Sequence, residues 1–100
     1  MDNRLEEKML LIVNNYFAAR RLLSDNREMS DDNFSILCSY VNNVRKAFNT
    51  LNDEEKIFLN NEYFFQAPLD WWKKIWNQEK YQKMKEVTLN HFLGAFYVRY

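Results

Sequence analysis

One glycine and one proline, Gly94 and Pro68, occur among the 100 residues of this chain, and their scarcity constrains the fold. Tight turns between β-strands depend on glycine, proline and a few other residues, so the chain has little turn chemistry for hairpins of strands. Helices joined by short polar connections are the alternative. We therefore expect an all-α protein.

The composition predicts one folded domain spanning residues 1–100, because 47% of the residues are apolar and 17% are aromatic. The 14 basic and 14 acidic residues balance, so any surface for nucleic acid must be local. The chain has no apolar run of 18 residues, its N-terminus is acidic, and its single cysteine, Cys38, fits a reducing compartment. We expect a cytoplasmic protein with no membrane partner.

The first half, residues 1–50, predicts two helices, from Asn3 to Leu23 and from Asp31 to Asn49. In each, apolar residues recur at spacings of three and four, which places them on one face. In the first helix these are Leu5, Met9, Ile12, Tyr16, Ala19 and Leu23. In the second they are Phe34, Leu37, Val41, Val44, Phe48 and Leu51. The favoured interpretation is an antiparallel helical hairpin, and the alternative is pairing of the second seam with another copy of the chain.

A third helix is expected to open at Asn52, because N-D-E-E supplies a capping side chain and Glu55 can reach back to the Asn52 amide. Three successive acids also suit the positive end of the helix dipole. The helix must end before Gln66, since Pro68 disfavours helical geometry at Ala67. Its predicted core residues are Ile57, Phe58, Tyr63 and Phe64.

Two further helices complete a predicted total of about five. A short one starts at Leu69-Asp70, with Asp70 as its cap, and a longer one runs from an Asn77 cap to about Tyr97. The short helix carries Trp71, Trp72, Ile75 and Trp76. The buried stripe of the long helix is expected to contain Tyr81, Met84, Thr88, Leu89, Phe92 and Phe96. Their lengths and spacing are those of a helix-turn-helix.

At these residues the chain resembles a known family. The stretch L-N-D-E-E-K-I-F-L-N-N-E-Y-F is similar to the opening helix of region four of bacterial sigma factors and of small phage-type transcription activators related to it. The stretch W-W-K-K-I-W-N-Q-E-K-Y-Q-K-M-K-E-V-T-L-N-H-F-L is similar to the helix-turn-helix itself. It also resembles short proteins of AT-rich bacteria in which W-W precedes S-x-S-T-Y-Y-R-x-K. The usual turn glycine, the serine or threonine cap and the arginines are missing here.

The resemblance, which covers about residues 51–96, implies a DNA-binding helix. Carried over by position, the base-facing candidates are Gln78, Glu79, Gln82 and Lys83, and the phosphate candidates are Lys73, Lys74 and Lys80. From Asp70 to Lys85 five lysines stand against two acids, a local surplus of three positive charges. The plainer interpretation is a solvated lysine face on an ordinary helix.

Two functions follow as hypotheses. The first is a small transcription-associated protein that binds double-stranded DNA, RNA polymerase or both, as sigma region four does. The second is a non-enzymatic protein-interaction adaptor, including a homodimer formed through the first two helices, that has lost its DNA contacts. Salt dependence separates them, because phosphate binding weakens steeply with salt.

Catalytic chemistry is not expected. The acids that open the third helix are explained by capping, with no histidine predicted near them. His91 is interpreted as a packed or hydrogen-bonded core residue, and Cys38 as a small core residue without a basic neighbour. We expect no catalytic residues, no metal site and no cofactor.

Overall fold

The computed structural model of the chain describes residues 3–25, 29–65 and 67–97, and within these ranges its regular structure is entirely helical. The four α-helices are α1 (Asn3–Ser24), α2 (Asp31–Asn49), α3 (Asp53–Leu59) and α4 (Gln78–Tyr97). A π-helical segment (Asn60–Phe64) continues α3, and a 3₁₀ segment (Trp71–Lys74) precedes α4. The expected all-α class is confirmed.

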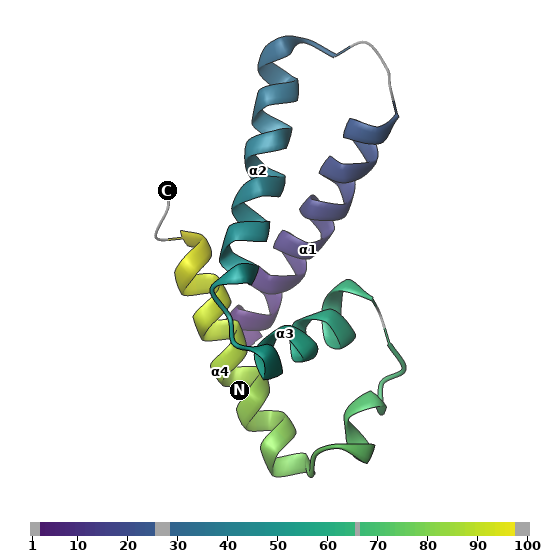
Figure 1. The fold of residues 1–100 in the computed structure, drawn as a ribbon, viewed down its shortest axis with the longest axis vertical. Coiled ribbons are helices and arrows are strands. Elements are labelled where there is room, and N and C mark those ends of the chain that lie inside the picture. Colours follow the sequence, from purple (N-terminus) through teal and green to yellow (C-terminus); the bar gives the residue numbers. More distant parts are fainter. Residues whose placement is uncertain (1–2, 26–28, 66, 98–100) are drawn as a thin grey trace.

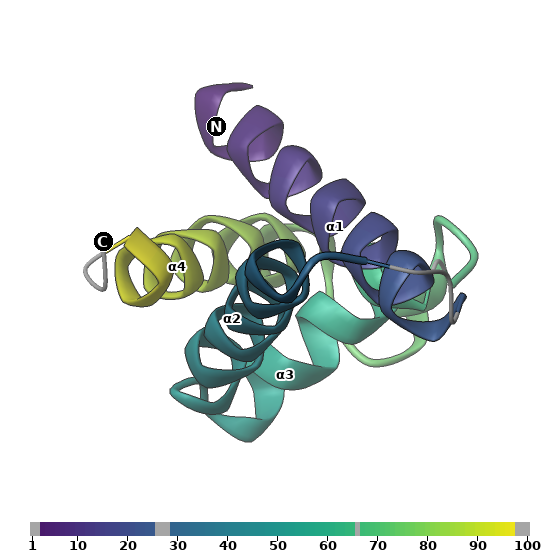
Figure 2. The ribbon, with the colours of Figure 1, turned by 90° about the horizontal axis from the view of Figure 1, so that it is seen from above.

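The four helices pack around one core, with α1, α2 and α4 in contact with one another and α3 in contact with α4 (Figure 1). α1 and α2 run antiparallel and pack on one another, and α4 packs against both. α3 lies across the lower end of this group and packs against α4. Seen from above, α1 and α3 lie on opposite sides of α2, and α4 extends from α2 toward the left (Figure 2). None of the helices in the described ranges is both long and apolar enough to cross a membrane.

The core takes side chains from all four helices, mostly from the predicted faces. Buried residues of α1 and α2 are Met9, Ile12, Val13, Tyr16, Ala19, Val41, Val44 and Ala47. Those of the second half are Leu51, Phe58, Leu59, Tyr63, Leu89, Phe92, Leu93 and Phe96. The seam of α2 is therefore covered largely within one chain, although Phe34 at its start is exposed.

The core face of α3 differs from the expected one at one position. Glu55, Phe58 and Leu59 are buried, and they share one face at spacings of three and four. Ile57 falls off that face and is exposed, so the expectation that it packs in the core was wrong. Beyond Leu59 the chain widens into the π-helical segment, where the Phe65 amide donates to the Asn60 carbonyl at 2.7 Å.

Both ends of the third helical stretch follow the predicted chemistry. The Asn52 side chain accepts from the Glu55 amide at 2.9 Å, and the Asn52 amide donates to the Glu55 carboxylate at 3.1 Å, which is the reciprocal cap. At the other end, the Ala67 amide still donates to the Asn61 carbonyl at 3.0 Å, directly before Pro68. Gln66 lies outside the described residues.

The short helix expected from Leu69 is a 3₁₀ segment of four residues instead of an α-helix. Its hydrogen bonds span three residues, as from the Lys73 amide to the Asp70 carbonyl at 3.0 Å. The Asp70 side chain does not cap it, so that expectation was wrong. The predicted cap of α4 is confirmed, since the Asn77 side chain accepts from the Lys80 amide at 2.8 Å.

The reciprocal cap gives a prediction about stability. Replacing Asn52 with alanine removes one partner of an α3 amide, so we expect the free energy of unfolding to fall by about 1 kcal/mol. Urea denaturation followed by circular dichroism measures the change. The matched control is Asn14→Ala, at an exposed position of α1, which should change stability little. Equal losses in the two variants would contradict a specific role for the cap.

Candidate nucleic-acid interface

The seven candidate residues all lie on the surface, at the lower end of the molecule (Figure 1). Lys73 and Lys74 belong to the 3₁₀ segment, and the other five belong to the first two turns of α4. We call this surface the α4 face. It consists of Lys73, Lys74, Gln78, Glu79, Lys80, Gln82 and Lys83.

The α4 face rests on a cluster of aromatic rings around Phe58, a fully buried residue of α3. The ring centroids of Trp71, Trp76 and Tyr81 lie 5.9, 6.4 and 5.8 Å from that of Phe58. Trp72 packs sideways and stacks on Tyr81 at 4.4 Å. Both adjacent tryptophans are thus half-buried. Each such ring pair contributes about 0.5–1.5 kcal/mol beyond the area that it buries.

A carboxylate of the π-helical segment ties this cluster together. Glu62 accepts from the Trp71 indole at 2.9 Å through one oxygen and from the Tyr81 hydroxyl through the other. Burial, and then the hydrogen bond to Glu62, raise the pKa of Tyr81. Glu62 therefore connects the segment that precedes α4 with the first turns of α4.

Glu6 of α1 extends the same network to the N-terminal helix. One of its oxygens accepts from the Tyr63 hydroxyl at 2.9 Å and lies 3.0 Å from Lys85 Nζ, which is also 3.8 Å from Glu62. Burial, and then the charge of Glu6, raise the pKa of Tyr63. We call Glu6, Glu62, Tyr63, Tyr81, Lys85 and Trp71 the polar network.

None of the contacts of the polar network was predicted from the sequence. Lys85 counts there only as one of the five lysines between Asp70 and Lys85. A spacing signal did exist, because Glu6, Met9 and Val13 share one face of α1, and Tyr81, Lys85 and Leu89 share one face of α4. An ionisable residue in line with core residues is a candidate for pairing inside the protein.

The charge on the α4 face is smaller than the sequence count. Lys80 Nζ lies 2.9 Å from Glu54, and it also approaches the Trp76 ring at 5.6 Å. The Lys85 side chain is only 17% exposed and is held by two carboxylates. The carboxylates of Glu54, Glu6 and Glu62 thus approach lysines of residues 70–85. Their three negative charges equal the surplus of three positive charges in that stretch. In the described ranges, Lys73, Lys74 and Lys83 form no ion pair.

A hollow of about 440 Å³ lies along the outer side of α4, between the charged residues of the face. Its polar lining includes Glu79, Lys80 and Lys83, and its apolar lining consists of Met84 and Val87. Three of the seven predicted residues therefore surround one concave site. Its mixture of both charges with an apolar floor suits a protein or nucleic-acid surface better than a simple anion.

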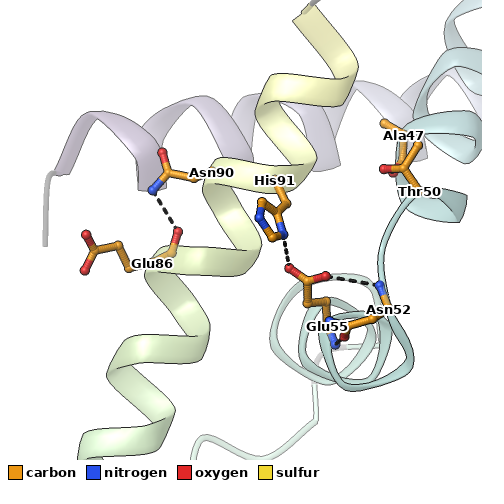
Figure 3. Close-up of polar contacts among 7 residues, drawn as sticks. All are labelled: Ala47, Thr50, Asn52, Glu55, Glu86, Asn90 and His91. Atoms are coloured by element: carbon orange, nitrogen blue, oxygen red, sulfur yellow. Dashed lines mark hydrogen bonds and ion pairs between the residues drawn. The ribbon is translucent and has the colours of Figure 1, made fainter.

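His91 contradicts its predicted place in the core. Its side chain is 61% exposed, and its Nδ1 lies 2.5 Å from an oxygen of Glu55, whose own side chain is 4% exposed (Figure 3). The expectation that no histidine stands near the acids of α3 was also wrong. α4 crosses the start of α3 and brings His91 to Glu55, which already holds the Asn52 amide.

The pair of Glu55 and His91 joins the start of α3 to α4, with the carboxylate buried and the histidine ring largely exposed. Among the residues that the structure describes, no third side chain bonds to the histidine ring. In the same ranges no group of three or more His, Cys, Asp or Glu side chains gathers to hold a metal ion. Cys38 is half-buried and lies in a surface groove between α1 and α2.

Removing the centre of the polar network should weaken the whole α4 face. Glu62→Ala leaves the Trp71 indole and Tyr81 hydroxyl without their acceptor, so we expect a loss of about 1–3 kcal/mol in the free energy of unfolding. Urea denaturation monitored by tryptophan fluorescence measures it. Glu86→Ala, at an exposed position of the same helix, is the control. Equal stability of the two variants would exclude a supporting role for Glu62.

The raised pKa values of Tyr63 and Tyr81 predict sensitivity to alkali. A folded-state pKa above the ordinary value of 10.0 means that unfolded chains lose these protons first. Stability is therefore complete below pH 10.0 and falls as the pH rises above it. The urea concentration at the unfolding midpoint, measured at a series of pH values above 10.0, should fall less steeply in Tyr63→Phe/Tyr81→Phe than in the unmodified chain. An unchanged slope in that variant would contradict the assignment.

Comparison with protein-family models, with curated proteins and with solved structures finds no match to this chain. What the α4 face binds is therefore inferred from its geometry and chemistry. The seven residues selected by position in the sequence are all exposed, and three of them, Glu79, Lys80 and Lys83, line one hollow.

Proposed function

We propose that this protein is a small transcription-associated protein whose α4 face binds double-stranded DNA, RNA polymerase or both. The supporting observation is that the predicted base-facing and phosphate-facing side chains are all exposed, on the 3₁₀ segment and the first two turns of α4. In this proposal the 3₁₀ segment and α4 act as a shortened helix-turn-helix, with α4 as the recognition helix. The function agrees with the resemblance of residues 51–96 to sigma region four.

Groove binding is supported by the chemistry of the helix start. In helix-turn-helix proteins the N-terminal residues of the recognition helix contact base edges. Gln78 and Gln82 carry amides that can donate to and accept from bases, and they lie on one side of α4, while Lys83 lies on the adjacent side with Glu79. Lys73 and Lys74 sit one segment earlier, where they can reach the phosphate backbone. Ring contacts of Trp71 and Trp72 with Tyr81 join this segment to α4.

The charge balance supports a joint contact with polymerase. Three unpaired lysines supply few phosphate contacts, so DNA binding by a single chain would be weak. Glu79 lies among them, and the exposed Ile75 adds an apolar contact of the kind found in protein interfaces. A surface of this mixture can bind a protein that itself sits on DNA.

A second candidate function is a protein-interaction adaptor that makes no DNA contact. It is favoured by the loop before the 3₁₀ segment, where Leu69 is 94% exposed and Phe65 is 73% exposed. Large apolar side chains exposed next to a folded face mark contact sites when they cluster. The pairing of Lys80 with Glu54 also fits this function, because it neutralises one phosphate candidate.

Fluorescence anisotropy with random duplex DNA tests the first function. With three phosphate contacts the logarithmic salt slope is about −2.7, so affinity should fall about 40-fold between roughly 50 and 200 mM salt. Lys73→Glu/Lys83→Glu should abolish binding. The matched control is Lys8→Glu/Lys46→Glu, which changes the net charge equally at exposed positions outside the α4 face.

Absence of binding by the unmodified chain at low salt would exclude direct DNA recognition. Purified RNA polymerase is then the second probe, and retention that Lys73→Glu/Lys83→Glu abolishes would support the transcriptional role. Retention that is insensitive to both charge reversal and salt would favour an apolar contact through Phe65 and Leu69.

A further inference from the structure

Two adjoining hollows lie beside the antiparallel pair of α1 and α2. The first has a volume of about 380 Å³ and reaches the π-helical segment, and the second has a volume of about 470 Å³ and follows α1 and α2. Phe17, Arg20 and Arg45 line both of them. The two hollows therefore adjoin at these three side chains, and we call them together the hairpin groove.

The first hollow is walled by aromatic rings that meet edge to face. The ring of Phe64 lies 5.6 Å from Tyr16, 6.2 Å from Phe17 and 6.2 Å from Phe48, with interplanar angles of 84°, 72° and 89°. Rings in this arrangement line the open hollow at steep angles to one another and do not present a flat stacking surface. Such a space accepts one apolar side chain and offers little area on which a nucleic-acid base can stack.

The edge of the groove is positively charged. Arg20 and Arg45 line the shared part and Arg21 lines the second hollow, while the Arg20 guanidinium lies 5.6 Å from the centroid of the Tyr16 ring. Within the described ranges no Asp or Glu lines either hollow, and Arg20 and Arg45 form no ion pair with a carboxylate. On a chain with a net charge of zero, this is a local surplus.

Hydrogen-bonding groups complete the lining. Asn49 and Asn60 border the first hollow, and their amides offer both donors and acceptors. A peptide backbone requires both kinds of partner, whereas phosphate requires donors alone. An aromatic hollow with arginines and amides at its edge thus complements an extended, acidic peptide.

We propose that the hairpin groove binds an acidic peptide segment of a partner protein. One aromatic or leucine side chain of the peptide enters the hollow walled by Phe17, Phe48 and Phe64, and flanking carboxylates pair with Arg20 and Arg45. Arginine and carboxylate form paired hydrogen bonds, which fixes the position of the segment. This site uses no residue of the α4 face and does not depend on the function proposed above.

A displayed library of random peptides, selected on the full chain, tests the proposal. We expect enrichment of peptides with one Phe, Trp or Leu flanked by Asp or Glu. The most enriched peptide, labelled with fluorescein, serves as the anisotropy probe. Arg20→Glu/Arg45→Glu should weaken its affinity by about tenfold or more, because attraction becomes repulsion. Phe65→Ser, an exposed substitution in the lining, should weaken it as well.

The control variant is again Lys8→Glu/Lys46→Glu, which should bind the probe like the unmodified chain. Lys73→Glu/Lys83→Glu should also retain the peptide, so failure of the DNA proposal and failure of this one are distinguishable. The proposal is overturned by enrichment of peptides without acids, by equal binding to Arg20→Glu/Arg45→Glu, or by equal binding of a probe whose acids are replaced with lysine. Displacement of the probe by single-stranded DNA would identify a nucleic-acid site instead.

Discussion

The packing of Trp71, Trp76 and Tyr81 on Phe58 holds the start of α4 against α3. The 3₁₀ segment has four residues, too few to form an apolar face of its own. Its two tryptophans instead pack on α3 and on Tyr81, so the position of α4 is fixed by ring contacts. The exposed surface at this end of the molecule depends on that packing.

The polar network adds direction to the aromatic packing. Ring contacts tolerate small rotations, whereas Glu62 must meet an indole nitrogen and a hydroxyl at the same time. Lys85 connects this carboxylate to Glu6, which joins the N-terminal helix to the C-terminal half of the chain. The positive charge of Lys85 is paired with these two carboxylates, so it adds little to the attraction of a negatively charged ligand.

Local chemistry in the sequence was enough to predict much of the fold. The periodicity of α1, α2 and α4, the reciprocal cap at Asn52 and the cap at Asn77 each depend on residues within one or two turns of one another. The π-helical segment could not be predicted in this way, because its extra residue per turn is compensated by contacts of Tyr63 with Glu6, 57 residues away. His91 was misplaced for the same reason. Its position on α4 was near the predicted stripe, and only the crossing of α3 gives it Glu55 as a partner.

The residues of the α4 face were chosen from the sequence by position, and their electrostatics could not be predicted in that way. Counting charges along a stretch assumes that each lysine faces solvent, and Lys80 and Lys85 instead meet carboxylates from three other elements. The apolar hollow beside α1 and α2 had no sequence signal of its own, because Phe17, Phe48 and Phe64 come from three separate elements. Each of these rings looks like an ordinary core residue when its element is considered alone.

The π-helical segment places two residues with different partners close together. Glu62 turns toward Trp71 and Tyr81, while Phe64, two residues later, turns toward Tyr16 and Phe17. The π-helical turn accommodates one residue more than an α-helical turn would. A substitution or deletion that removed the extra residue would therefore disturb the aromatic cluster around Phe58 and the ring contacts of Phe64 at the same time.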